Sequence, residues 1–345
     1  MKKKPGPLRQ LARIGAFLLL FSLLFSVVSY GLRDKRYAAA GSSIYHEPKG
    51  SIDVVFLGSS HMLNAVAPMQ LWRDFGLASN NLAQNGQTLA VSYYALLEAL
   101  RVQQPRLIVL DVYKIVQESL IDSDASLHYT LDCMEFGVPK LRAITDLLPP
   151  DRWGEYLFDI VAYHDRWKEL TPQDFQLLDL TEKGAEALFT VEPMPDFRPI
   201  PADETAEPPQ TAADYLERIV RLCRERQVEL LLVAVPYGVP EPDDLHRQQS
   251  VNWVTAWAEE RGVPFVNLMY RTEELGFDFG TDMADGAHVN WRGMAKVTGW
   301  LGAYLTEQYD LPDHRGKAAY ASWDLTLEAY EQGLRTKLSR LGLES

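Results

Sequence analysis

Four short apolar runs, each flanked by turn residues, constrain the fold of this chain more than any other feature. They cover residues 52–57 (IDVVFL), 106–112 (RLIVLDV), 229–235 (ELLLVAV) and 264–268 (PFVNL). Such runs are typical of strands buried on both faces of a sheet. Helical patterns separate them, at residues 88–103, 212–227 and 245–261. Strands alternating with helices predict a parallel sheet, of about five strands, with helices on both faces.

The stretch from about 115 to 210 departs from this alternation, because it contains no convincing buried strand. Its first part has aromatic-rich helical segments, and its second part, "EPMPDFRPIPADETAEPPQ", has six prolines. We interpret the first part as a helical insertion and the second as a surface loop. The main domain then covers residues 51–310, and a C-terminal extension, residues 311–345, contains one more amphipathic helix.

The N-terminus contains nineteen residues without a charge, from Ile14 to Leu32. This is close to the ~20 residues that a helix needs to cross a bilayer. A cleaved signal peptide is the alternative, but its apolar region is normally ~7 to 15 residues long. The length of the run therefore favours an uncleaved transmembrane anchor over residues 14–32.

The charges around this run predict its orientation. The preceding basic residues are Lys2, Lys3, Lys4, Arg9 and Arg13, with no acid among them. By the positive-inside rule, residues 1–13 form a cytoplasmic tail. Residues 33–50 then form a stalk outside the cytoplasm, and the domain that follows is extracytoplasmic. The basic residues on the far flank, Arg33, Lys35 and Arg36, oppose this orientation without reversing it.

Composition excludes several classes of function. The chain has 34 basic and 47 acidic residues, a net charge of -13, whereas a nucleic-acid binder needs a basic face. Its two cysteines, Cys133 and Cys223, show no zinc-type spacing. The P-loop, EF-hand, HExxH and dinucleotide-binding glycine patterns are absent. We therefore expect no nucleic-acid partner, no metal and no cofactor.

The stretch "VVFLGSSHM" places serines at the carboxyl end of the first strand, where parallel sheets bind their ligands. A serine nucleophile needs a base, an acid that orients the base, and donors for the oxyanion. Among seven histidines, only His288 has an informative setting, since Asp285 precedes it by three positions. A carboxylate there can fix the tautomer of the imidazole. Taken alone, this turn could equally serve to cap the next helix.

Taken together, "FLGSSH" and the Asp-x-x-His before the last helix of the sheet domain resemble the SGNH/GDSL hydrolase superfamily. The resemblance implies a three-layer α/β/α enzyme. It also implies that Ser60 is the nucleophile, His288 the base and Asp285 the residue that orients it.

The family's oxyanion-binding motifs are matched only in part. Gly86 in "NNLAQNGQT" corresponds to the glycine whose amide helps bind the oxyanion, with the amide of Ser60 as the second donor. The family's later asparagine is missing, because "LIVLDVYKI" places Asp111 or Tyr113 there. Either Asn85 or Tyr113 then supplies the side-chain donor, or the site is weaker than that of a typical esterase.

An anchored domain with "LGSSH" and a degenerate third motif resembles the D-alanyl transfer proteins of teichoic acid modification and the exopolysaccharide acetylation proteins. This implies acyl-ester chemistry on a cell-envelope glycopolymer, with an acyl donor and a multi-pass membrane O-acyltransferase as partners. One alternative is a non-catalytic scaffold that binds a polymer or such an acyltransferase. Another is a secreted carbohydrate esterase, if the N-terminal segment is cleaved.

Four further residues are candidate substrate contacts: His61, Tyr113, Tyr237 and Trp291. Tyr237 follows a strand and should therefore lie at the active edge of the sheet. His61 could instead be an exposed residue at a helix start, and Trp291 could be an ordinary core aromatic.

Overall fold

The computed structural model describes residues 6–35, 38–238 and 242–343. Its contacts divide the chain into two compact units. The first unit joins residues 1–36 to residues 148–178, and the second joins residues 37–147 to residues 179–345. Part of the predicted insertion therefore belongs with the N-terminal helix and not with the sheet.

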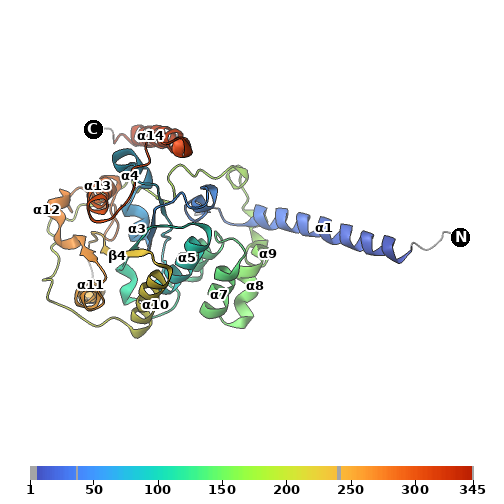
Figure 1. Ribbon diagram of the computed structural model, residues 1–345, viewed down its shortest axis with the longest axis horizontal. Coiled ribbons are helices and arrows are strands. Elements are labelled where there is room, and N and C mark those ends of the chain that lie inside the picture. The colour runs from blue at the N-terminus through green and yellow to red at the C-terminus, as the bar shows by residue number, and fades with distance from the viewer. Residues whose placement is uncertain (1–5, 36–37, 239–241, 344–345) are drawn as a thin grey trace. The chain divides into compact units, whose positions relative to one another are not determined.

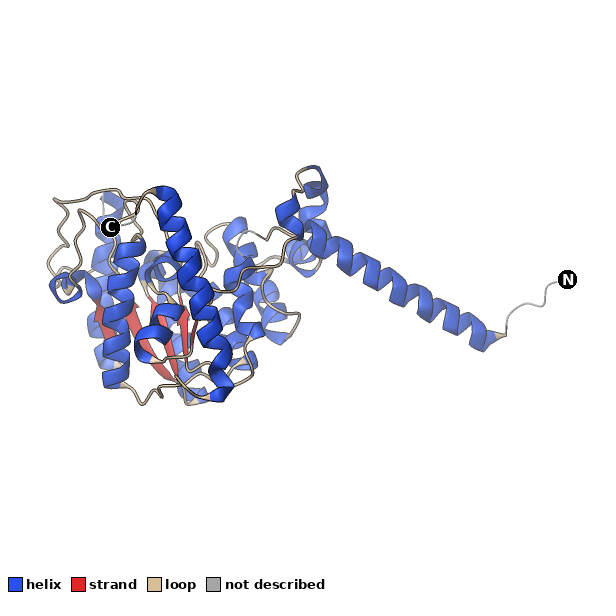
Figure 2. Ribbon diagram, turned by 90° about the horizontal axis from the view of Figure 1, so that it is seen from above, coloured by secondary structure: helices blue, strands red, loops and turns tan. Residues whose placement is uncertain are grey.

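The second unit is built on a parallel five-stranded sheet, which confirms the predicted fold class. The strands are β1 (Val54–Leu57), β2 (Ser79–Asn81), β3 (Leu107–Asp111), β4 (Glu229–Ala234) and β5 (Phe265–Asn267). Their order is β2-β1-β3-β4-β5, and all four pairings are parallel. Figure 2 shows the strands side by side among the helices that cover them.

Both faces of this sheet are covered by helices (Figure 1). One face carries α3 (Ser60–Ala65), α4 (Pro68–Phe75) and α13 (Trp291–Gln308), and the other carries α5 (Leu89–Val102), α10 (Gln210–Arg226) and α11 (Pro242–Glu260). Alternate residues of a strand point to opposite faces. Val54 and Phe56 accordingly join one core cluster with Leu301 of α13, and every residue of β1 is fully buried.

Strand β2 consists of Ser79, Asn80 and Asn81, so the apolar pattern did not mark it as clearly as the other strands. All three side chains are buried. The side-chain Nδ2 of Asn81 donates to the carbonyls of Met62 and Val66, which satisfies a polar group that would otherwise be costly to bury.

The remaining elements belong to one or the other of the two units. In the second unit they are α2 (Ala38–Ser42), η1 (Ser43–His46), η2 (Tyr113–Val116), α6 (Asp124–Leu131), α7 (Val138–Leu147), η6 (Leu268–Tyr270), α12 (Thr272–Leu275), η7 (Ala318–Tyr320) and α14 (Ala321–Leu341). In the first unit they are η3 (Pro150–Arg152), α8 (Trp153–Leu157), α9 (Asp159–Tyr163), η4 (His164–Lys168) and η5 (Pro172–Phe175). Residues 176–209 contain no helix or strand, as expected for a loop.

Two predicted appendages pack on the second unit. Within the predicted stalk, Ile44 is only 1% exposed, and the hydroxyl of Ser43 accepts a hydrogen bond from the side-chain Nδ2 of Asn80. In the C-terminal extension, Trp323 is buried and its ring lies 5.1 Å from that of Trp72. Burial of Ile44 and Trp323 away from water is favourable, so these segments fold with the sheet.

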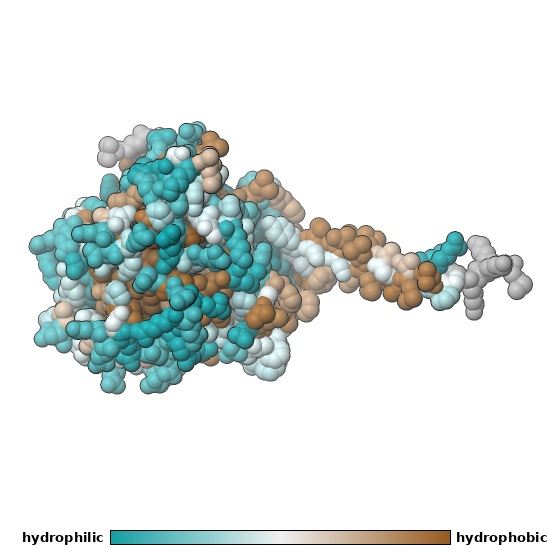
Figure 3. All heavy atoms as spheres, in the orientation of Figure 1, coloured by the Kyte–Doolittle hydropathy of each residue, from teal (hydrophilic) through white to brown (hydrophobic). Residues whose placement is uncertain are grey.

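The first unit contains α1 (Pro7–Leu32), which is long and apolar enough to span a membrane. Figure 3 shows hydrophobic side chains along most of this helix, and most of them are exposed. Of the predicted basic tail, Lys2, Lys3 and Lys4 lie outside the described residues.

Candidate active site

The turn after β1 depends on Gly58. Its φ is +145°, in a region that residues with a side chain rarely adopt. A Cβ at this position would lie 2.8 Å from the Cβ of Asp111. Ser59 then caps α3 by accepting a hydrogen bond from the amide of His61, so that Ser60 becomes the first residue of this helix.

The strand order places this turn where ligands of open parallel sheets bind. The chain leaves β1 for its neighbour β2 and returns to pair β3 on the other side of β1. The carboxyl ends of β1 and β3 are therefore a topological switch point. Ser60 follows β1, and Asp111 and Tyr113 lie at the end of β3.

A short, hydrogen-bonded loop presents His288 at the same edge. Met283 and Val289 form an antiparallel bridge, and the amide of Ala284 donates to the carbonyl of His288 at 2.8 Å. The fully buried Asn290 closes this loop.

Asn290 joins the loop to α13 through both ends of its side chain. Its oxygen caps α13 by accepting from the amides of Arg292 and Gly293, and its nitrogen donates to the carbonyls of Thr281 and Met283. Sequence reasoning missed Asn290, although an asparagine directly before a helix is a recognisable capping signal.

Ser60, His288 and Asp285 form a chain of hydrogen bonds. Nε2 of His288 lies 2.7 Å from Oγ of Ser60, across 228 positions of sequence. Nδ1 of His288 lies 3.0 Å from each carboxylate oxygen of Asp285. A serine hydroxyl, an imidazole and a carboxylate in this order have the geometry of a nucleophile, its base and the group that orients the base.

The carboxylate of Asp285 is held in its charged form. Partial burial opposes ionisation, but the amide of Ala287 and the nearby His288 outweigh it and lower the pKa of Asp285. Its Oδ1 accepts from the amides of Ala287 and His288, both at 2.8 Å. An ionised Asp285 keeps a proton on Nδ1 of His288, which leaves Nε2 free to accept the proton of Ser60.

Three of the candidate substrate contacts form an aromatic cluster beside His288. The ring of His61 stacks on that of Tyr113, with centroids 3.2 Å apart, and lies 4.8 Å from the ring of His288. Tyr237 meets the ring of Tyr113 edge-on at 5.1 Å. His61 is 3% exposed, so it is not an exposed helix start, and Tyr237 is 1% exposed. The guanidinium of Arg247, from α11, covers the ring of Tyr113 at 4.2 Å; no sequence signal marked this residue.

This cluster carries polar atoms suited to a ligand. Burial lowers the pKa of His61 well below its ordinary value, and the nearby His288 and Arg247 lower it further, so His61 is neutral. Within the described part of the chain, the hydroxyl of Tyr237 is buried without a hydrogen-bond partner, and the buried ring of His61 interacts with the backbone of Ala287 in the loop that carries His288. Buried polar atoms are normally satisfied, and unsatisfied ones next to a nucleophile are typical of substrate-binding positions.

The loop with Asn85 and Gly86 runs beside the turn that carries Ser60. The amide of Gln84 donates to the carbonyl of Gly58 at 3.2 Å, which joins the two turns. Gly86 has φ +68°, and a Cβ there would lie 2.7 Å from both Asp122 and Ser126. A glycine is therefore required at Gly86 by its backbone and by its neighbours.

The end of β3 carries an unusual carboxyl group. Asp111 is 2% exposed, and burial raises its pKa to about 7 against the opposing effect of backbone amides. Its Oδ2 accepts from the amide of Tyr113 at 3.3 Å, and the backbone amide of Val235 also favours the ionised carboxylate. Asp111 packs against Gly58, in the turn that precedes Ser60.

Trp291 lies apart from the aromatic cluster. It begins α13, where its ring stacks on Phe189 at 5.7 Å and is covered by the guanidinium of Arg292 at 4.5 Å. It is only partly buried, so it is not the core aromatic that was the alternative.

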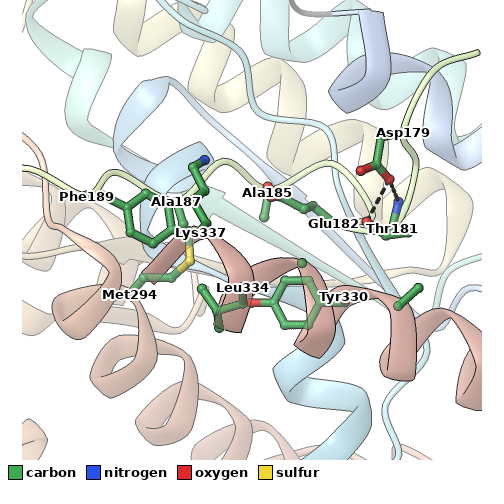
Figure 4. Close-up of a pocket in the computed structure, with 12 residues that line it drawn as sticks. Asp179, Thr181, Glu182, Ala185, Ala187, Phe189, Met294, Tyr330, Leu334 and Lys337 are labelled. Carbon is green, nitrogen blue, oxygen red and sulfur yellow. Dashed lines mark hydrogen bonds between the residues drawn. The ribbon is translucent and has the colours of Figure 1, made fainter. Parts of the chain in front are cut away.

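A separate cavity of about 360 Å³ lies between α14 and the irregular segment at residues 179–189 (Figure 4). Phe189, Met294 and Leu334 provide apolar walls, and Glu182 and Lys337 provide charges. The residues that line it include none of Ser60, His288 and Asp285.

The sequence matches no protein-family model and no curated protein. Among solved structures, it is similar to a GDSL-like lipase from Bacteroides thetaiotaomicron, with 11% identity and a TM-score of 0.41 over 79% of this chain and 98% of the other. A protein assigned as an acylhydrolase from Bacteroides fragilis has 13% identity and a TM-score of 0.39, over 80% and 97% of the two chains. A protein assigned to the G-D-S-L lipolytic family from Desulfitobacterium hafniense has 11% identity and a TM-score of 0.38, over 73% and 99%. Sequence identities and TM-scores this low do not show what this chain acts on. Its chemistry must therefore be inferred from its own site.

Proposed function

We propose that this protein is a serine-dependent acyl ester hydrolase or acyltransferase. The observation that carries the proposal is the hydrogen-bonded chain of Ser60, His288 and Asp285, with 2.7 Å between Oγ of Ser60 and Nε2 of His288. A non-catalytic scaffold would need none of these three side chains in this arrangement.

In the proposed reaction, the oxygen of Ser60 bonds to the carbonyl carbon of an acyl ester while its proton passes to Nε2 of His288. The tetrahedral intermediate then expels the alcohol, which takes that proton, and the acyl group stays on Ser60. Water or an acceptor hydroxyl next gives its proton to His288 and attacks the acyl carbon. The oxygen of Ser60 leaves and recovers the proton, so the enzyme is restored.

The oxyanion formed in both steps requires hydrogen-bond donors. We assign this role to the amides of Ser60 and Gly86, with the side chain of Asn85 or Tyr113 as a further donor. The bond between Gln84 and Gly58, which joins the two loops, supports this assignment. The unpartnered hydroxyl of Tyr237 and the ring of His61 would contact the acyl or acceptor group, whereas the ring of Trp291 is already occupied by Phe189 and Arg292 and is assigned no substrate contact.

For the substrate, we propose a cell-envelope polysaccharide or teichoic acid, modified outside the cytoplasm with a multi-pass membrane O-acyltransferase as partner. The apolar helix α1 supports this substrate class, because it could anchor the enzyme in the membrane. An enzyme anchored there would act on polymers close to the membrane. The choice between transfer and hydrolysis then depends on whether an acceptor hydroxyl or water reaches the acyl group on Ser60.

A fluorophosphonate probe tests the nucleophile directly, since it reacts with an activated serine. We expect the wild-type protein to be labelled and Ser60→Ala to remain unlabelled. Ser59→Ala is the matched control, and it should still be labelled, because Ser59 is 1% exposed and its hydroxyl lies 3.3 Å from Nδ1 of His61. Labelling of Ser60→Ala but not of Ser59→Ala would show that the wrong serine is assigned. No labelling of any of the three would favour the non-catalytic scaffold.

A further inference from the structure

Residues 148–178 pack against one end of the apolar helix. The ring of Phe158 meets that of Phe25 at 6.4 Å, edge to face, and Asp159 pairs with Arg33 at 2.7 Å. Figure 1 shows α9 beside the C-terminal end of α1. We call residues 148–178 the helix-end segment.

The contact with Phe25 shows how far this segment extends along α1. Phe25 lies seven residues before Leu32, which at 1.5 Å per residue is about 10 Å from the end of the helix. The helix-end segment therefore lies alongside the apolar stretch and not only beyond it. At the same level, Leu24, Val27 and Val28 of α1 remain 48–69% exposed. At this level of α1, the helix-end segment is therefore in the same surroundings as these exposed side chains.

The helix-end segment exposes large apolar side chains of its own. They are Phe158 (51% exposed), Val161 (47%), Trp167 (65%), Phe175 (70%) and Leu177 (98%). Single exposed apolar residues are common, but this many in 31 residues are typical of a binding surface. Tryptophan in particular is enriched where membrane meets water.

One pair of charged side chains in the segment, Arg166 and Asp174, is shielded in a way that suits surroundings poor in water, while Asp165 and Lys168 beside Trp167 stay exposed, as the headgroup side of a membrane interface allows. Arg166 donates to the last carbonyls of α1, those of Leu32 and Arg33, at 2.8 and 2.6 Å. It also pairs with Asp174 at 2.7 Å, and these two side chains are only 21% and 10% exposed. Helix-end carbonyls otherwise depend on water, and lipid offers them no donor.

We propose that the helix-end segment inserts its apolar side chains into the interface of the lipid bilayer that α1 spans. The leaflet is the one that receives the C-terminal end of α1, and the depth is the roughly 5–10 Å of other interfacial helices. The occupant of this surface is therefore lipid at the boundary between headgroups and acyl chains. The proposal requires α1 to span a membrane, but it does not depend on the chemistry at Ser60.

Tryptophan quenching in vesicles tests the proposal with the full chain. The protein is reconstituted in phosphatidylcholine vesicles whose acyl chains carry bromine either near the headgroup or near the chain end. Because the chain has 8 tryptophans, the signal of Trp167 is the difference between the wild type and Trp167→Phe. Trp253→Phe, on α11 in the second unit, is the matched control.

We expect bromine near the headgroup to quench more strongly than bromine near the chain end, and Trp167→Phe to lose a large part of the quenchable emission, with the half-buried Trp153 of the same segment supplying the remainder. Trp253→Phe should keep all of it. Equal quenching of the wild type and Trp167→Phe would overturn the proposal, provided that the protein resists extraction by alkaline carbonate. Complete extraction by carbonate would overturn the anchor and this proposal together, while fluorophosphonate labelling of Ser60 would be unaffected.

A second measurement compares two exposed leucines, Leu177 and Leu325, which are 98% and 69% exposed. Each is replaced by cysteine in a Cys133→Ala, Cys223→Ala background and labelled with a polarity-sensitive fluorophore. We expect blue-shifted emission at position 177 in vesicles and water-like emission at position 325. Water-like emission at position 177 that shifts only when a membrane acyltransferase is added would instead identify a protein partner and contradict lipid as the occupant.

Discussion

At the scale of single residues, the site depends on which atoms of Asp285, His288 and Ser60 carry a proton. Asp285 is ionised because two backbone amides and His288 outweigh its partial burial. It therefore fixes the tautomer of His288 that can accept a proton from Ser60. His61 lies next to this pair but is kept neutral, so it adds no positive charge to compete with a protonated His288.

Replacing the base should nearly abolish turnover. We expect His288→Ala to lower kcat for a soluble ester by about 10² to 10⁴, because this is the usual contribution of general-base catalysis. Binding of the substrate should change little, so KM should stay within a small factor. Steady-state kinetics of the purified protein measure both constants. A variant that retains most of its activity would show that another group is the base.

The raised pKa of Asp111 predicts how stability depends on pH. The ordinary value is 3.8 and the folded value about 7, so above pH 4 the unfolded chain loses a proton that the folded protein keeps. The stabilisation is complete below pH 4 and is lost as the pH rises through 7. The slope from this group is at most about 1.4 kcal/mol per pH unit.

Asp111→Asn removes this titration without changing the size of the side chain. We expect the free energy of unfolding of the variant to fall less than that of the wild type between pH 4 and 7. Urea denaturation at a series of pH values measures the difference. Parallel curves for the two proteins would mean that Asp111 titrates normally.

At the scale of elements, α13 and the loop that carries His288 depend on each other through Asn290. Loss of its cap should cost about 1 kcal/mol, and the carbonyls left without a donor add about 1–3 kcal/mol. We therefore expect Asn290→Ala to lower both the free energy of unfolding and kcat. Thermal unfolding and kinetics below the transition temperature check the two effects.

The matched control is Asn267→Ala, because Asn267 caps the short η6 in the same way, by accepting from the amide of Met269. It should lose stability with a smaller effect on kcat. Equal losses of kcat in the two variants would mean that Asn290 acts only through overall stability and does not position His288.

At the scale of the whole molecule, the apolar helix α1 bears on whether the chain is held in a membrane. An uncleaved α1 should keep the intact chain in the membrane pellet after alkaline carbonate treatment, since a span of this length and composition is stable in a bilayer. Fractionation followed by intact-mass measurement checks this. A shortened, soluble form that lacks the N-terminal residues would instead identify a cleaved signal peptide and favour a secreted esterase.

Local pattern was enough to predict much of the fold. Buried strands on both faces of a parallel sheet are almost wholly apolar, so β1, β3, β4 and β5 were recognisable from composition alone. Strand β2, Ser79–Asn81, was harder to recognise because its polar side chains are satisfied by partners from other segments, such as the carbonyl of Met62 for Asn81. Gly58, Ser60, Asp285 and His288 were singled out because the two motifs that contain them resemble those of a known hydrolase superfamily; neither motif alone assigned their roles.

Contacts between distant parts of the chain could be found only in the folded structure. No spacing rule connects Arg247 to Tyr113, places His61 between Tyr113 and His288, or assigns the helix-end segment to α1. Local patterns report how each segment satisfies its own backbone and apolar face, and these requirements act over a few residues. Which segments then share a core or a site depends on the packing of the whole chain, because many partners could satisfy the same local pattern.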